Sequence, residues 1–187
     1  MNERELEIGL SDINRNRYLA HLEAIGENKK LPLAALHELC YKTGRSPVAF
    51  RAAWILEHVA VHHPEKFIVV FDAFIRRLAK QRNFSCQRHF TKILMIITSP
   101  GAPQDYRLAY ARADREQLLT VVFEWLVAPE TPVAVQANCM EVLFNMSGEF
   151  EWLRDELKLQ IEFLLRNGSA AIQSRGKKVL DGLARRG

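Results

Sequence analysis

The chain has 187 residues, of which 48% are hydrophobic and 26% are charged, and this globular composition excludes an intrinsically disordered protein. Its nine glycines and seven prolines leave little material for the turns of a β-rich fold. A net charge of +4 permits contact with nucleic acid, but an excess of this size is common in proteins that bind none.

Targeting and redox signals point to the cytoplasm. The N-terminus is polar, so we expect no secretory signal, and apolar runs such as 67–71 and 93–97 are far shorter than the roughly 20 residues that cross a bilayer. Cys40, Cys86 and Cys139 are widely spaced and form no CxxC pair, which favours buried free thiols over a disulfide framework or a zinc knuckle. The sequence predicts no membrane contact and no bound cofactor.

Two helices are predicted before the first strong pattern of the chain. Ser11 has the residue type of an N-cap and opens a stretch that we expect to be helical to about residue 25. Pro32 opens a second helix, to about residue 42, and Gly44 provides its C-terminal stop.

The clearest predicted unit is a helix pair over residues 46–82. Ser46 as N-cap and Pro47 at the first helical position open a helix that runs to about residue 62. Pro64 opens its partner, and so short a turn forces the two helices to pack antiparallel. Each helix has one apolar stripe at helical spacing, formed by Val48, Ala52, Ile55, Leu56 and Val59 and by Phe67, Val70, Phe71, Phe74, Ile75 and Leu78.

This unit is repeated later in the chain. Thr131-Pro132-Val133-Ala134 matches Ser46-Pro47-Val48-Ala49 at an offset of 85 residues, from position 46 to position 131. A less regular pair over 85–127, with Ser85 at its start, contains an insertion at 99–114 that has room for one or two helical turns. First helices thus start near 47, 85 and 132, at intervals that bracket the ~40–47-residue period of HEAT and armadillo repeats.

The sequence therefore predicts an all-α fold, a right-handed α-α superhelix of antiparallel HEAT-like helix pairs, in one domain over 1–187. The helix pairs are expected at about 11–43, 46–82, 85–127 and 131–167, and a helix at 169–186 is expected to cap the array.

Four stretches carry a narrower resemblance: FRAAWILEH at 50–58, RHFTKIL at 88–94, PVAV at 132–135 and SRGKK at 174–178. In these the chain resembles a family of short HEAT-like proteins from Bacteroidetes-type bacteria, which implies stacked helix pairs and no particular activity.

Proteins of this kind sometimes carry the name adenylosuccinate lyase. That superfamily places a catalytic serine on a Gly/Ser-rich loop with a Met-Pro step. Here Ser147-Gly148 is predicted as an interhelix turn and Ser99-Pro100-Gly101 has no methionine, so we expect no lyase activity.

Three histidines, His58, His62 and His63, cluster where the first helix of the clearest pair ends. His58 and His62 are four residues apart, so both imidazoles face the same way and can reach one metal ion, with Glu65 as a third ligand. A paired-His motif without a catalytic glutamate between its histidines is weak, and cationic rings at a helix C-terminus also favour the helix dipole. We therefore assign no metal ligand.

Asp72 lies inside the otherwise apolar helix that Pro64 opens. HEAT-like DNA glycosylases hold a damaged nucleotide with an aspartate and aromatic side chains on the concave face, and Trp54, Trp125 and Trp152 would supply the aromatics here. Core packing explains the tryptophans without a ligand, and an ion pair with Arg76 four residues on explains Asp72.

Basic residues come in clusters, which are Arg76, Arg77, Lys80 and Arg82; Arg107, Arg112 and Arg115; and Arg175, Lys177, Lys178, Arg185 and Arg186. If the clusters converged on one face, they would form a groove for phosphates. Charged outer faces are common in helical repeats, and several of these cations lie in last turns, where they favour the helix dipole.

The function that we expect is a non-enzymatic helical-repeat scaffold that binds a protein partner along its concave face or its insertion. A nucleic-acid-binding or DNA-glycosylase-like protein is the alternative. The residues expected to contact an anion or a partner are Arg51, Arg88, Arg175, Lys177 and Lys178, and no catalytic residue is assigned. Convergence of His58, Asp72, Arg88 and Arg175 in one cleft would instead favour a small-ligand site. The sequence does not indicate the oligomeric state.

Overall fold

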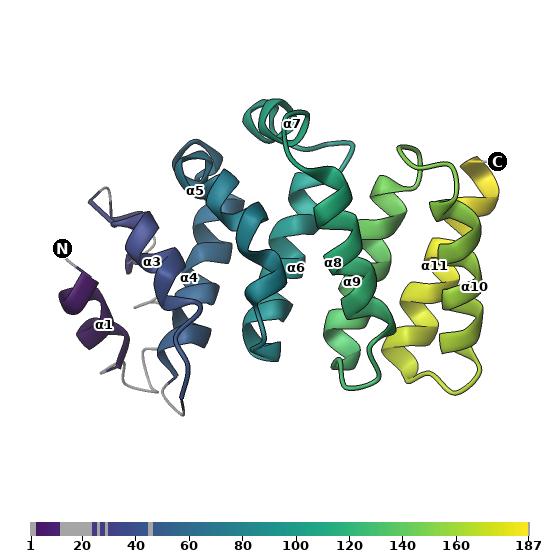
Figure 1. Ribbon diagram of the computed structural model, residues 1–187, viewed down its shortest axis with the longest axis horizontal. Coiled ribbons are helices and arrows are strands. Elements are labelled where there is room, and N and C mark those ends of the chain that lie inside the picture. The colour runs from purple at the N-terminus through teal and green to yellow at the C-terminus, as the bar shows by residue number, and fades with distance from the viewer. Residues whose placement is uncertain (1–2, 12–23, 26, 29, 45–46, 187) are drawn as a thin grey trace.

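The computed structural model describes residues 3–11, 24–25, 27–28, 30–44 and 47–186, and these form helices and turns with no strand among them (Figure 1). The all-α repeat prediction is therefore confirmed. The described helices are α1 (Glu3–Ser11), α3 (Leu33–Leu39), α4 (Val48–His62), α5 (Pro64–Arg77), the 3-10 turn η2 (Leu78–Lys80), α6 (Phe84–Ile97), α7 (Gln104–Tyr110), α8 (Arg115–Val127), α9 (Val133–Met146), α10 (Leu153–Leu165) and α11 (Ala170–Arg186).

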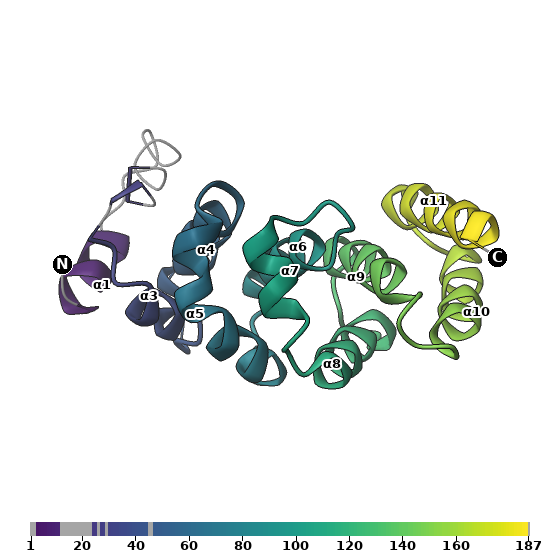
Figure 2. The ribbon, with the colours of Figure 1, turned by 90° about the horizontal axis from the view of Figure 1, so that it is seen from above.

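The helices form two rows. One row consists of α4, α6, α9 and α11, each packed on the next, and the other contains α3, α5, α8 and α10 (Figure 2). The array is gently curved, and the row of α4, α6, α9 and α11 lies on the inner side of the curve. We call the surface of this row the inner face. Since α4 and α9 occupy corresponding places in the row, the equivalence predicted from the 85-residue offset is confirmed.

One continuous apolar core runs between the rows, from Leu6 in α1 to Leu183 in α11. Every member of the two apolar stripes predicted for α4 and α5 is buried. Burial of a side chain such as Leu or Phe contributes roughly 1.5–3 kcal/mol, and each helix pair obtains this only against its neighbours in the array.

The three cysteines are buried free thiols, as predicted. Burial raises the pKa of Cys86 to about 12 and also raises the pKa of Cys40 and Cys139. None of the described helices is both long and apolar enough to cross a membrane.

Helix starts follow the proline positions with small differences. Pro32, Pro47 and Pro132 each lie directly before the first helical residue, so the prediction that Pro47 takes the first helical position was one residue early. Ser46 lies outside the described residues. Helix α6 begins at Phe84, one residue before the predicted start at Ser85. Asn83 caps it, because its side-chain oxygen accepts hydrogen bonds from the backbone N–H groups of Ser85 at 2.9 Å and Cys86 at 3.4 Å.

Ser11 itself is helical, and the helix that it was expected to open, to about residue 25, stays a prediction. Ser11 is the last residue of α1, and its hydroxyl donates to the Glu7 carbonyl at 2.9 Å. The polar segment forms this helix because Leu6 and Leu10, four residues apart, bury one side of it in the core. Residues 12–23 of the helix expected at 11–25 lie outside the described residues. The expected C-terminal stop is present after α3, where Gly44 has φ 110°, in the region that favours glycine.

The insertion at 99–114 is held by one tyrosine. Helix α7 packs on α5, and Tyr106 is fully buried against Phe67 and Phe71 of α5. Its hydroxyl donates to the Ala60 carbonyl of α4 at 2.6 Å. The insertion is therefore part of the core of the preceding helix pair.

Replacing Tyr106 tests this anchor. Tyr106→Phe leaves the Ala60 carbonyl without its buried donor, so we expect it to lower the free energy of unfolding by about 1–3 kcal/mol. Tyr106→Ala also creates a cavity and is expected to cost about 3–5 kcal/mol. Urea denaturation followed by circular dichroism measures both changes. Leu108→Ala is the control on the same helix, because Leu108 is 53% exposed and its loss should change stability little.

His37 is a buried histidine in an aromatic cluster. It is 1% exposed, its ring lies 5.3 Å from that of Tyr41 and 6.1 Å from that of Phe74, and its Nε2 has no hydrogen-bond partner. Burial, as the larger cause, and the nearby charge of Arg77 together lower the pKa of His37 from 6.5 to about 4. The folded protein therefore keeps this imidazole neutral.

Acid should destabilise the protein through His37. Between pH 6.5 and pH 4 the unfolded chain protonates His37 and the folded chain does not, so the free energy of unfolding falls as pH falls through this window, by about 3 kcal/mol. His37→Phe should remove this dependence, and urea titrations at several pH values measure it. His62→Gln, at an exposed histidine, is the control. An unchanged pH slope in His37→Phe would contradict the assignment.

Candidate functional site

Polar pairs join neighbouring helices along the inner face. Between α4 and α6, the Glu57 carboxylate accepts from His89 Nδ1 at 2.5 Å and from Lys92 Nζ at 2.9 Å. Burial alone would raise the pKa of Glu57, but these hydrogen bonds outweigh it and hold the pKa below the ordinary 4.5. Glu57 is thus a charged residue that is 15% exposed and paired on both oxygens.

Neutral pairs join α6 and α9. The Asn138 amide donates to the Thr91 hydroxyl at 3.0 Å, and the Asn145 amide donates to the Thr98 hydroxyl at 3.2 Å. Each threonine in turn donates to a carbonyl of its own helix. The two threonines and the two asparagines are both seven residues apart, which returns each side chain to the same face after two helical turns.

Charged residues also connect α9 and α11. Glu141 of α9 accepts from Arg175 of α11, and Lys178 Nζ lies 3.9 Å from the same carboxylate. The Arg175 side chain is 28% exposed and the Lys178 side chain 73%, whereas Glu141 is 18% exposed. As at Glu57, the acid is covered, and one lysine partner, Lys178 here and Lys92 there, is the more exposed group.

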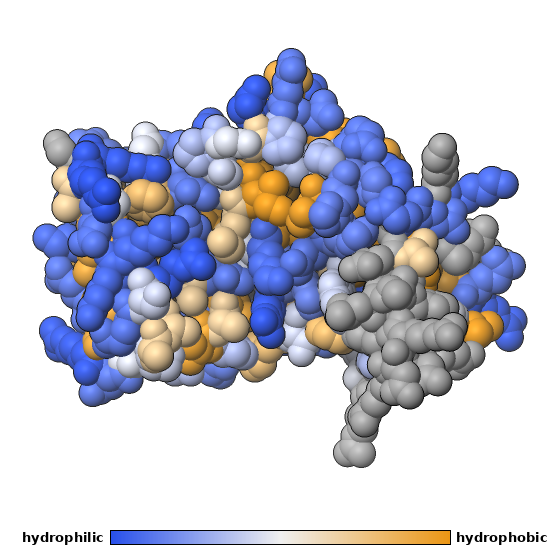
Figure 3. All heavy atoms as spheres, turned by 180° about the vertical axis from the view of Figure 1, so that it is seen from behind, coloured by the Kyte–Doolittle hydropathy of each residue, from blue (hydrophilic) through white to orange (hydrophobic). Residues whose placement is uncertain are grey.

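The centre of the inner face contains a hollow of about 690 Å³. Figure 3 shows this side of the molecule, on which apolar atoms interrupt a mostly hydrophilic surface near the middle. The hollow extends over helices α4, α6, α9 and α11 and the start of the insertion. Its lining consists of Glu57, Lys92, Met95, Ile96, Ser99, Pro100, Gly101, Ala102, Glu141, Phe144, Asn145, Lys178 and Arg186.

One end of the hollow is built by the close approach of α11 to α9. Gly182 lies against the Phe144 ring, and a Cβ at this position would be 2.6 Å from a ring carbon. The Arg186 guanidinium lies 3.8 Å from the centre of the same ring and donates to the Phe144 carbonyl at 2.8 Å. The aromatic ring thus provides an apolar wall next to a cation.

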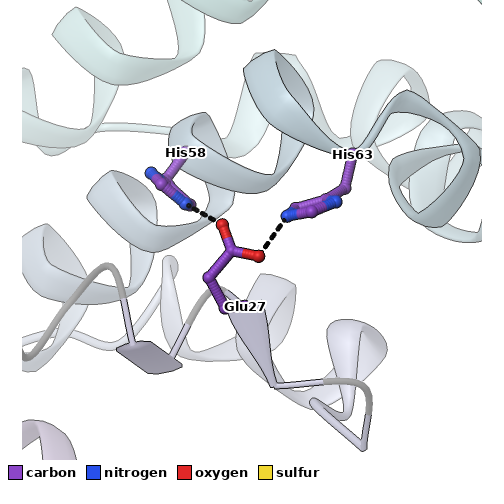
Figure 4. Close-up of side chains that lie close together, drawn as sticks. All are labelled: Glu27, His58 and His63. Atoms are coloured by element: carbon purple, nitrogen blue, oxygen red, sulfur yellow. Dashed lines mark hydrogen bonds and ion pairs between the residues drawn. The ribbon is translucent and has the colours of Figure 1, made fainter.

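A second cluster lies at the end of α4, outside the hollow. Figure 4 shows the Glu27 carboxylate between two imidazoles, with one oxygen 3.2 Å from His58 Nε2 and the other 2.9 Å from His63 Nε2. The hydrogen bonds from His63 and then His58 lower the pKa of Glu27 below its ordinary value. The set considered from sequence was His58, His62 and Glu65, with no metal ligand assigned; in the structure Glu27 joins His58 and His63, and His62 is exposed.

The five residues expected to contact an anion or a partner do not form one cluster. Arg51 donates to the carbonyls of Leu10 and Ser11, where a cation favours the C-terminal end of α1. Arg88 is exposed on α6. On α11, Arg175 and Lys178 face Glu141, and Lys177 is exposed. The role of these residues stays a prediction.

His58, Asp72, Arg88 and Arg175 do not meet in one cleft. Asp72 lines a separate cavity of about 720 Å³ beside the insertion, together with Arg76 and Arg112. No ion pair joins Asp72 to Arg76 in the described part of the chain, so that prediction is wrong; Asp72 is exposed instead.

The tryptophans have three different surroundings. Trp125 is 5% exposed in the core, and Trp54 is half-buried with its ring stacked on that of His89. Trp152 is 52% exposed, so the prediction that core packing explains this residue is wrong. It precedes the first turn of α10 and contacts Phe123.

The basic clusters lie in different parts of the array, on α5 and η2, around the insertion, and on α11. Most of their guanidinium groups already bind the chain itself. Arg77 pairs with Glu38, Arg115 binds Glu149 at 2.9 Å, and Arg107 donates to the Ala102 carbonyl at 2.8 Å. This arrangement offers no continuous phosphate groove along the described residues.

Sequence reasoning missed Glu27, Glu57, Glu141 and the Thr–Asn pairs. The repeated seven-residue spacing of Thr91 and Thr98 and of Asn138 and Asn145 is a visible signal for the pairs. Glu27 has none, because it belongs to no periodic helix pattern.

Glu57→Gln tests the covered acid. The amide cannot balance the charge of Lys92 and offers one acceptor oxygen in place of two, so the free energy of unfolding at pH 7 should fall by about 1–3 kcal/mol. The difference in the free energy of unfolding between wild type and variant should persist above pH 4.5. It should disappear as the pH falls through the pKa that Glu57 has in the folded protein, which lies below 4.5. Urea denaturation at several pH values measures it. Glu130→Gln, at an exposed turn position, is the control, and an equal loss there would refute the role of the ion pairs.

Comparison with known proteins bears on the whole array. A model of the HEAT repeat domain matches residues 10–183. No curated protein matches the chain. A crystal structure of an engineered protein from the Northeast Structural Genomics Consortium is distantly similar over 99% of this chain and 98% of its own, at 14% identity and a TM-score of 0.42. The narrower resemblance to short Bacteroidetes proteins is not tested by these matches and stays a prediction. From the family match and its stacked helix pairs, the chain belongs to the HEAT repeat family.

Proposed function

We propose that this chain is a non-enzymatic scaffold whose inner face binds a segment of a partner protein that carries acidic and apolar side chains. The observation that carries the proposal is the hollow at the centre of the inner face. An extended surface of this kind, built by several consecutive repeats, is what helical-repeat proteins use to hold their partners. A single domain over 1–187 and a cytoplasmic location, which suits the free thiols, belong to the same proposal.

The floor of the hollow is apolar. Met95, Ile96 and Phe144 are half-buried there, packed against the core from the solvent side. An aliphatic or aromatic side chain of a partner would cover the apolar surface that these residues expose. Methionine adapts its shape to different partners, which suits a recognition surface.

The rim of the hollow favours negative charge. Lys92 and Lys178 are 42% and 73% exposed, whereas Glu57 and Glu141 are 15% and 18% exposed. Because the acids are covered, a ligand meets the cations first, and Arg186 adds a third at the Phe144 end. The Asn145 NH2 group already donates to Thr98 and Met95, so Asn145 offers a partner its amide oxygen, as an acceptor for a backbone N–H.

No specific observation supports either alternative function considered from the sequence, nucleic-acid binding or lyase activity. The dispersed basic clusters give no groove for nucleic acid. At the two turns considered for a lyase-type serine, the Ser147 hydroxyl is covered and donates to the Phe144 carbonyl at 2.8 Å, and Ser99 accepts from the Gly101 N–H at 3.2 Å.

A peptide-display selection tests the proposal. Random peptides selected on the folded protein should be enriched in Asp or Glu beside an apolar residue. Their affinity should fall by about tenfold or more in Lys178→Glu, which reverses a rim charge, and in Ile96→Asp, which makes the floor polar. Fluorescence anisotropy measures the affinities.

Lys158→Glu is the matched control, since Lys158 is exposed on α10 in the other row. Peptides that bind Lys178→Glu and wild type equally would overturn the proposal. Duplex DNA is measured beside the peptides at two salt concentrations. DNA binding that is strongly salt-sensitive and lost in Lys178→Glu, without peptide binding, would establish the nucleic-acid alternative instead.

A further inference from the structure

We propose that Glu27, His58 and His63 form a binding site for a divalent cation of the zinc type. Their three ligand atoms lie within 4.8 Å of one another. Two imidazole nitrogens and one carboxylate oxygen are donors that zinc and its neighbours in the transition series accept, and the same set with an open position occurs in catalytic zinc sites. This site is separate from the hollow of the inner face.

The distances fit a tetrahedral ion. Zinc lies about 2.0–2.2 Å from nitrogen and oxygen ligands, so two ligands of one tetrahedron are roughly 3.3–3.5 Å apart. The Glu27 oxygens are 3.2 Å from His58 Nε2 and 2.9 Å from His63 Nε2 (Figure 4). An ion held by the two Nε2 atoms and one Glu27 oxygen would require these spacings to widen slightly.

The fold brings together residues that the sequence separates. His58 lies in the last two turns of α4, and His63 lies in the single-residue turn before α5. Glu27 approaches from the segment that precedes α3, more than 30 residues earlier in the chain. An ion at this point would therefore join that segment to the turn between α4 and α5.

The surroundings also suit a metal. The His58 and His63 side chains are 16% and 21% exposed, so their rings are held by the fold, while Glu27, at 56%, leaves a path for the ion and room for water as a fourth ligand. The other nitrogen of His63, Nδ1, lies 3.6 Å from a Glu65 oxygen. An outer carboxylate in this place orients a ligating imidazole and increases its basicity.

Titration of zinc into the untagged, chelator-treated full chain tests the site. Isothermal calorimetry should show one zinc ion bound per chain, and cobalt(II) should give the visible absorption bands of a tetrahedral ion. Glu27→Gln, His58→Gln and His63→Gln should each weaken zinc binding by more than about tenfold. Circular dichroism establishes that each variant is folded, and Glu27→Gln, at an exposed position, changes the least in shape.

His62→Ala is the matched control, because its ring lies 4.6 Å from that of His58 but outside the three-residue cluster. Zinc affinity within about twofold of wild type in this variant, together with the losses above, supports the site. Loss of zinc binding in His62→Ala with retention in His63→Gln would overturn it in favour of the i, i+4 pair. Absence of zinc and cobalt binding in the wild type would overturn it outright and leave Glu27 as a hydrogen-bond acceptor only.

Discussion

The structure depends on apolar stripes that no helix pair can cover alone. The stripes of α4 and α5 are completed by α3 on one side and α6 on the other, and the same holds along the array to α11. Because the gain from burial is shared between neighbours, the position of each helix is fixed by the helices before and after it. The inner face and its hollow exist only as a product of this stacking.

Much of the fold was predictable because its signals are local. Proline before a helix and apolar residues at helical spacing are visible in any short window, and the pair predicted over 85–127 ends at Val127, the last residue of α8. The errors have local causes as well. The start of α6 was predicted one residue late, at Ser85, because the capping role of Asn83 depends on the backbone geometry there. In α1, burial of Leu6 and Leu10 stabilises a helix although the neighbouring residues are polar.

The candidate sites were less predictable because they depend on contacts between distant residues. Glu57 meets Lys92 across 35 positions, and Glu141 meets Arg175 across 34. A charged residue on a helix has the same local pattern whether it faces solvent or a neighbouring helix. The histidine cluster shows the same limit: sequence spacing selected His62, whereas the turn between α4 and α5 directs His63 toward Glu27.

The polar pairs along the inner face differ in kind from one interface to the next, and this difference bears on how the array bends. Charged groups join α4 to α6 and α9 to α11, whereas amides and hydroxyls join α6 to α9. Dissolved ions screen the exposed charges and leave neutral hydrogen bonds nearly unaffected. Because Glu57 and Glu141 are covered, screening acts mainly on the exposed lysines Lys92 and Lys178. Rising ionic strength should therefore weaken the polar links of the two flanks in part and leave those of the centre nearly unchanged, so that bending of the array would concentrate in the flanks.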